Sequence, residues 1–417
     1  MRSRAANAAR NGLAWIFPTP RSRRREEAGR ALVSHIPPPH VGGYRLGLVL
    51  AAMVLSAQPV LADGSNAWPM FHGTQTLSGV SAAPLPVTLE LKWTFPTGGP
   101  VKSSAAIADG RVFVGSADGQ VYALALDTGK RVWSFKTGDA IEASPLWLEG
   151  RVYVGSSDHF LYALDAATGA LQWKYETGGK ILGSANWVRV DGDPHARVIV
   201  GSYDNRLHCV DAVTGQPRWT FETTNYINGA PAVAGAHIVF GGCDGQLHVL
   251  DASHGQSLAE IDAGAYVAGS PAVSGTEAFV GQFANEVLAV DWKTEAVRWR
   301  TTVPNCEFFS SPAVAGDRVL IGGRDKRLHC LDRQTGASRW TFSARGEVDS
   351  SPVVCADQVV FGADDGRLYV IDLAHGQLVW SYTIGKPISA SPAVTRDRVV
   401  IGSEDGAVYG FGPKPAR

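Results

Sequence analysis

Short apolar stretches with polar interruptions recur along the chain from residue 93 onward. One copy reads SPLWL (144–148), RVYVGS (151–156), LYALD (161–165) and LQWKY (171–175), with Gly, Asp and Thr at the bends. Runs of β-branched and aromatic residues bounded by Gly and Asp are typical of antiparallel strands joined by tight turns. Each unit therefore predicts four short strands, and no amphipathic helix is expected after residue 63.

A tryptophan near the end of each unit fixes the register. Successive positions are 40, 40, 46, 40, 40, 41 and 40 residues apart, and Ala259 stands where the fifth member falls. The seven tryptophans, which we expect to pack between neighbouring sheets, are Trp93, Trp133, Trp173, Trp219, Trp299, Trp340 and Trp380. Eight positions at this period predict an all-β fold, a single eight-bladed β-propeller of four-stranded antiparallel blades.

The last unit lacks its fourth strand. It starts near Ala390 and ends with AVYGF, with no tryptophan strand after it, whereas LELKWTF (89–95) precedes the first complete unit. We expect this N-terminal strand to complete the eighth blade and close the ring. Residues 63–417 are accordingly predicted to form one propeller domain.

The segment before the propeller has a different character. The stretch 46–62 is uncharged, follows Arg45 and ends in small residues, which predicts a signal peptide cleaved after Ala62 and a periplasmic or secreted protein. No cysteine stands directly after the stretch to carry a lipid, so a lipoprotein is not expected. A retained membrane anchor is the alternative, although the stretch is short for a span. Residues 1–43 are either part of the leader or an overextended gene start.

Charge and cysteine content narrow the expected partners. Residues 63–417 carry 29 basic and 37 acidic side chains, a formal charge of −8, and nucleic acid is therefore not expected as a partner. The five cysteines form no CxxC motif, and Cys209 and Cys330 replace the small alanine of other units, as core residues would. Neither a metal site nor a hydrolase motif is predicted.

Functional residues are expected where the units differ. The loop from each outer strand to the next inner strand should open at one end of the channel, where eight residues should form a ring: Lys102, Glu142, Leu182, Asn228, Ala268, Phe309, Asp349 and Ser389. The candidates for a binding face around this ring are Tyr226, Tyr266, Phe308, Phe309, Lys180 and Glu307. Aromatic residues in exposed loops are enriched at interfaces, and packing over the channel is the alternative for them.

The motif YALDAATGALQW (162–173), with the copies CVDAVTGQPRW and CLDRQTGASRW, resembles the repeat of the pyrroloquinoline-quinone (PQQ) type β-propeller family. The resemblance covers roughly residues 66–412 and includes WPMFHG (68–73), which is similar to the lead-in before the first blade. This family contains quinoprotein dehydrogenases, the outer-membrane assembly lipoprotein BamB and many exported proteins of undefined role.

The resemblance implies two functions of different classes. A BamB-like scaffold would be an exported, non-catalytic monomer without a cofactor, which binds a protein partner through its loop face in cell-envelope or outer-membrane protein assembly. A quinoprotein dehydrogenase would hold PQQ and calcium with Lys102, Glu142, Asn228 and Asp349, and would oxidise an alcohol or sugar with Asp349 or Glu142 as the catalytic base.

Three absences favour the scaffold over the dehydrogenase. The sequence has no adjacent Cys-Cys pair, no CxxCH haem motif and no large insertion to cover a cofactor. A purely structural module of a larger envelope assembly is a third interpretation.

Overall fold

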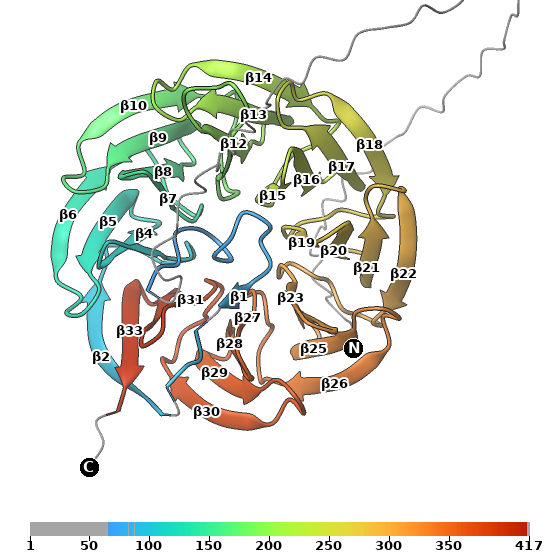
Figure 1. The fold of residues 1–417 in the computed structure, drawn as a ribbon. Coiled ribbons are helices and arrows are strands. Elements are labelled where there is room, and N and C mark those ends of the chain that lie inside the picture. Colours follow the sequence, from blue (N-terminus) through green and yellow to red (C-terminus); the bar gives the residue numbers. More distant parts are fainter. Residues whose placement is uncertain (1–65, 82, 87, 415–417) are drawn as a thin grey trace, which may run out of the picture. The chain divides into compact units, whose positions relative to one another are not determined.

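The computed structural model describes residues 66–414 apart from 82 and 87. The predicted leader and its cleavage after Ala62 lie outside the described residues. The described part of the chain consists of strands and turns, and none of it forms a helix long and apolar enough to cross a membrane. Its strands form eight antiparallel four-stranded blades arranged in a ring, the predicted eight-bladed β-propeller (Figure 1).

The blades follow one another in chain order, and in each complete blade the strands run from the channel outward. Blade 1 contains β3 (Ala106–Ala108), β4 (Arg111–Gly115), β5 (Gln120–Ala125) and β6 (Arg131–Lys136). Blade 2 contains β7 (Leu146–Leu148), β8 (Arg151–Gly155), β9 (Phe160–Asp165) and β10 (Leu171–Glu176). Blade 3 contains β11 (Asn186–Val188), β12 (Arg197–Gly201), β13 (Arg206–Asp211) and β14 (Pro217–Glu222). Blade 4 contains β15 (Ala232–Ala234), β16 (His237–Gly241), β17 (Gln246–Asp251) and β18 (Ser257–Asp262).

The second half of the ring repeats this pattern. Blade 5 contains β19 (Ala272–Ser274), β20 (Glu277–Gln282), β21 (Glu286–Asp291) and β22 (Ala296–Thr302). Blade 6 contains β23 (Ala313–Ala315), β24 (Arg318–Gly323), β25 (Arg327–Asp332) and β26 (Ser338–Ser343). Blade 7 contains β27 (Val353–Cys355), β28 (Gln358–Ala363), β29 (Arg367–Asp372) and β30 (Leu378–Thr383). Blade 8 contains β31 (Ala393–Val394), β32 (Val399–Ser403), β33 (Ala407–Pro413) and β2 (Leu89–Pro96).

The N-terminal strand closes the ring, as predicted. Strand β2 pairs antiparallel with β33, from Leu89 opposite Pro413 to Pro96 opposite Ala407. The two ends of the described chain therefore form one blade.

In six blades a tryptophan packs onto a glycine of the next blade. The indole N–H of Trp133 in blade 1 donates to the carbonyl of Ala166 in blade 2 at 3.0 Å, and its ring lies against Gly169. This contact is found at six places in all: Trp93–Gly129, Trp133–Gly169, Trp173–Gly215, Trp219–Gly255, Trp299–Gly336 and Trp340–Gly376. A side chain at these glycines would overlap the indole, because an added Cβ at Gly169 would lie 2.6 Å from the ring.

The residues before the first blade close the channel, which the sequence did not predict. Residues 66–79 and the short strand β1 (Val80–Ser81) run past the inner strands in the centre of the ring (Figure 1). Trp68 forms a β-bridge with Ile107 of blade 1, the carbonyl of Thr76 accepts from Val273 of blade 5, and β1 pairs parallel with β27 of blade 7. We call residues 66–81 the plug segment.

Candidate functional site

The eight ring positions predicted from the sequence surround a single cavity. The loops that join each outer strand to the next inner strand meet at one end of the channel, here called the loop face. The cavity has a volume of about 160 Å³ and all eight predicted residues line it: Lys102, Glu142, Leu182, Asn228, Ala268, Phe309, Asp349 and Ser389. The repeat thus brings one residue from every blade to a common site.

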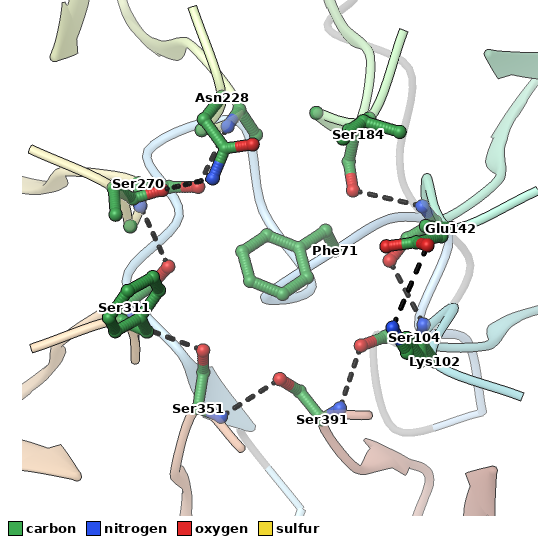
Figure 2. Close-up of a pocket in the computed structure, with 18 of the residues that line it drawn as sticks. Phe71, Lys102, Ser104, Glu142, Ser184, Asn228, Ser270, Ser311, Ser351 and Ser391 are labelled. Carbon is green, nitrogen blue, oxygen red and sulfur yellow. Dashed lines mark hydrogen bonds and ion pairs between the residues drawn. The ribbon is translucent and has the colours of Figure 1, made fainter. Parts of the chain in front are cut away.

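A circle of serines lies beneath these residues and links neighbouring blades (Figure 2). Each serine Oγ accepts the backbone N–H of the equivalent residue in the preceding blade; Ser144 accepts from Ser104 at 3.1 Å, and the N–H of Ser391 donates to Ser104 at 2.8 Å. The other members of the circle are Ser184, Ser270, Ser311 and Ser351. Ala230 takes this position in blade 4 and has no hydroxyl to offer the N–H of Ser184.

Phe71 of the plug segment forms the floor of the cavity. Its ring lies at the centre of the serine circle (Figure 2), stacked on His72 at a centroid distance of 4.5 Å. His72 is buried, and its Nδ1 is 3.0 Å from the carbonyl oxygen of Leu77. Burial lowers the pKa of His72 to about 4, so this side chain is neutral at neutral pH and donates to Leu77.

The predicted cofactor residues already have protein partners. Lys102 lies 3.7 Å from Glu142. Asn228 accepts from the Tyr203 hydroxyl at 2.9 Å and donates to the carbonyl of Ala268 at 3.0 Å. The donor and acceptor of this amide are therefore both engaged within the protein.

Arg324, which the sequence analysis did not single out, organises the rim at blades 6 and 7. It contacts both carboxylate oxygens of Asp349, at 2.8 and 3.1 Å, and also approaches Glu307 and Glu347 at 3.3 and 3.4 Å. Its guanidinium lies 3.6 Å above the centre of the Phe309 ring. The hydrogen bond to Asp349 raises the pKa of Arg324, and this cation holds three carboxylates and one aromatic ring together.

The same side of the loop face carries an excess of acidic groups. Burial, followed by the charges of Asp349, Glu404 and Glu347, raises the pKa of Asp364 to about 6. The positive charge of Arg324 acts against this shift. The five carboxylates of this region, here called the acidic arc, are Glu307, Glu347, Asp349, Asp364 and Glu404.

An aromatic arc continues the loop face across blades 3 to 6. Tyr203 and Tyr226 stack with parallel rings at 4.7 Å, Tyr266 lies 6.4 Å from Phe283, and Phe283 lies 5.8 Å from Phe309. Tyr226, Tyr266 and Phe283 are exposed by 47%, 53% and 41%. These five rings form the aromatic arc, of which Tyr203 and Phe283 were missed from the sequence because they lie in turns between second and third strands.

Phe308 corrects one expectation for the binding face. Its side chain is fully buried and packs against His329, with ring centroids 6.0 Å apart. It occupies the place that Ile141 and Val267 take in other blades, because adjacent residues of an extended chain point to opposite sides. Of the remaining predicted residues, Lys180 is exposed and Glu307 is partly exposed.

The ring residues do not fit a site for calcium-bound PQQ. Glu142 and Asp349 come from blades 2 and 7, and among the described residues neither belongs to a convergent group of three His, Cys, Asp or Glu side chains. Asp349 would have to exchange its contact with Arg324 for a metal ion. A cavity of about 160 Å³ is also smaller than the roughly 300 Å³ at which pockets begin to enclose ligands of cofactor size.

One family of known proteins matches most of this chain. The model of the family described as outer membrane protein assembly factor BamB matches residues 60–194, 189–307 and 305–415. A search among curated proteins gave no match.

The solved structures similar to this chain share its fold. BamB from Moraxella catarrhalis is 20% identical, with 78% of this chain and all of that chain covered at a TM-score of 0.66. A europium-containing methanol dehydrogenase is 13% identical, with 84% and 98% covered at 0.71. A quinohemoprotein alcohol dehydrogenase from Pseudomonas putida is also 13% identical, with 85% and 82% covered at 0.69.

Proposed function

The chain belongs to the family described as outer membrane protein assembly factor BamB, and from this we propose that it is an exported, non-catalytic scaffold that binds a protein partner through its loop face. The observation that carries the proposal is the aromatic arc. Three of its rings are between 41% and 53% exposed although each contacts another ring of the arc. Exposed aromatic side chains held in place by neighbours lose little conformational freedom on binding and are frequent at interfaces.

The acidic arc indicates the chemistry of the partner. Three of its five carboxylates share the single cation Arg324, and Asp364 lies within the field of the others. A segment that carries Lys or Arg next to apolar residues would satisfy both arcs at once, since opposite charges steer association and apolar contacts supply affinity. Binding of such a segment should weaken as salt is added.

The closed channel also supports a surface role. Phe71 fills the centre of the serine circle, and the cavity above it is small. A PQQ-dependent dehydrogenase remains the alternative, and the engaged ring residues give it less support. We further propose that the scaffold belongs to an assembly at the outer membrane.

Site-specific photocrosslinking tests the partner interface. A photoreactive phenylalanine analogue at Tyr266 is expected to crosslink one discrete partner in the source envelope, with the adduct on a segment containing Lys or Arg. Leu378, exposed by 55% on the outer strand β30, is the matched control position. The adduct should disappear when Tyr226 and Phe283 are changed to Ala.

Two results would contradict the proposal. Equal crosslinking from Leu378, or no adduct from Tyr266 in intact envelopes, would remove the loop face as the interface. An adduct on an acidic segment would preserve the interface and overturn only the partner chemistry.

A further inference from the structure

A recurring pair of side chains supports the turn between the second and third strands of seven blades. An Asp at the turn accepts a hydrogen bond from a residue four positions later. That residue is a tyrosine in four blades: Tyr122, Tyr162, Tyr369 and Tyr409. It is a histidine in three: His208, His248 and His329, each 2.9–3.0 Å from its aspartate.

Blade 6 adds a third potential metal ligand to its pair. The Sγ of Cys306, the carboxylate of Asp325 and a ring nitrogen of His329 all lie within 4.8 Å of one another, the one such group among the described residues. Cys306 is fully buried, and the side chains of His329 and Asp325 are only 5% and 13% exposed. At the position of Cys306, the other two Asp–His blades carry Gly179 and Asn225.

Gly323 leaves open the space onto which these atoms converge. A Cβ added there would lie 2.3 Å from Sγ of Cys306, 2.8 Å from Oδ1 of Asp325 and 3.3 Å from Nε2 of His329. One sulfur, one nitrogen and one carboxylate oxygen form a donor set that zinc uses, with a fourth position left for water. A small shift of the three side chains away from Gly323 would allow all three to bind one metal ion.

We infer that Cys306, Asp325 and His329 form a binding site for a single zinc ion. On binding, the thiol of Cys306 loses its proton to water and the sulfur becomes a thiolate ligand. The ion would tie the loop that carries Glu307 and Phe309 to the turn of blade 6, and so fix one end of the aromatic arc. The ligands come from two separate loops, and for this reason no local sequence motif indicates the site.

Cobalt serves as the probe because a thiolate ligand gives it a charge-transfer absorption in the near ultraviolet. Thiol-reduced, metal-stripped protein titrated with cobalt should develop this band at one equivalent, and zinc should abolish it by displacement. Cys306→Asn, which copies blade 4, is expected to lose the band completely. Cys330→Ser removes another buried thiol outside the site and should keep it.

A second variant separates metal binding from folding. His329→Tyr copies the residue of four other blades, so its hydroxyl can still donate to Asp325 while the nitrogen ligand is gone. We expect its metal-free melting temperature to stay close to that of the wild type and its affinity for cobalt to fall at least about tenfold. No band in the wild-type protein, or a band that persists in Cys306→Asn, would overturn the assignment.

Discussion

At the contact between blades 4 and 5, Ala259 and Glu295 take the places of the tryptophan and the glycine that meet at six other blade contacts. Glu295 keeps the positive φ of the turn, at 59°, although it carries a side chain. Trp292 of blade 5 shares a buried cluster with Ala259 and lies 4.8 Å from the ring of His237 in blade 4. At this contact the large aromatic residue therefore comes from the opposite blade.

The tryptophan contacts predict that alanine at the same position of two turns has unequal effects. Gly169→Ala should lower the free energy of unfolding by about 2–3 kcal/mol, through overlap with an indole and a strained backbone. Glu295→Ala, in the turn that meets no tryptophan, should change it by less than about 0.5 kcal/mol. Urea unfolding of both variants measures the difference, and equal losses would contradict this account of the contact.

The break in the serine circle predicts a stabilising substitution. Ala230→Ser would offer the missing hydroxyl to the N–H of Ser184, and we expect a gain of about 0.5–1.5 kcal/mol in the free energy of unfolding. Ser144→Ala, which removes an existing acceptor, should cost about 1–3 kcal/mol because it leaves a buried N–H without its partner. A loss of stability in Ala230→Ser would show that blade 4 has no room for the link.

The buried His72 predicts a loss of stability in mild acid. Its pKa is about 4 in the folded protein and 6.5 for a solvent-exposed histidine, so between these pH values the unfolded chain binds a proton that the folded chain does not. The resulting loss on going from pH 6.5 to 4 approaches about 3 kcal/mol. The raised pKa of Asp364 acts in the opposite direction, because the folded state there takes up the proton first.

The comparison with His72→Gln isolates the histidine from these other groups. Glutamine cannot take up the proton, so the stability of this variant relative to the wild type should rise as the pH falls from 6.5 to 4. Chemical unfolding at several pH values measures the difference. A constant difference across this range would contradict the role given to His72.

The engaged ring residues predict that PQQ with calcium has no effect on the protein. The melting temperature and the cofactor absorbance should show no saturable change. A saturable rise of the melting temperature that vanishes in Glu142→Ala and Asp349→Ala would instead establish the dehydrogenase alternative and require a search for its alcohol or sugar.

The sequence predicted those parts of the molecule that repeat. The period gave the eight blades, the closure by residues 89–95 and the eight positions around the cavity, because equivalent residues of a cyclic array must lie at equivalent places. Phe308 was placed on the wrong side because it was considered alone. When the repeats are aligned, Phe308 falls at the position of Ile141 and Val267, whose side chains are buried. Of the two phenylalanines, only Phe309 is then left to face outward.

The features that do not repeat could not be predicted in this way. The plug segment occurs once, and its position depends on contacts with inner strands as distant in the sequence as that of Ser81 with Cys355. Arg324 lies in a turn of blade 6 and has no distinctive sequence pattern. Its role follows from its contacts with Glu307, Glu347 and Asp349, which lie in the loops before and after this blade. Such contacts join side chains that differ from blade to blade, so the period of the sequence does not indicate them.

The plug segment and β2 also constrain the order in which the chain can fold during synthesis. The plug segment and β2 are synthesised before all the strands with which they pair, and their partners extend from Ile107 to Pro413. Until the last strand has been synthesised, apolar side chains of the plug segment and β2 stay exposed, and the incomplete propeller has an unpaired strand edge. Pairing over such separations is slow and exposes intermediates to aggregation. A chain interrupted after the seventh blade is therefore expected to need a chaperone or to be degraded.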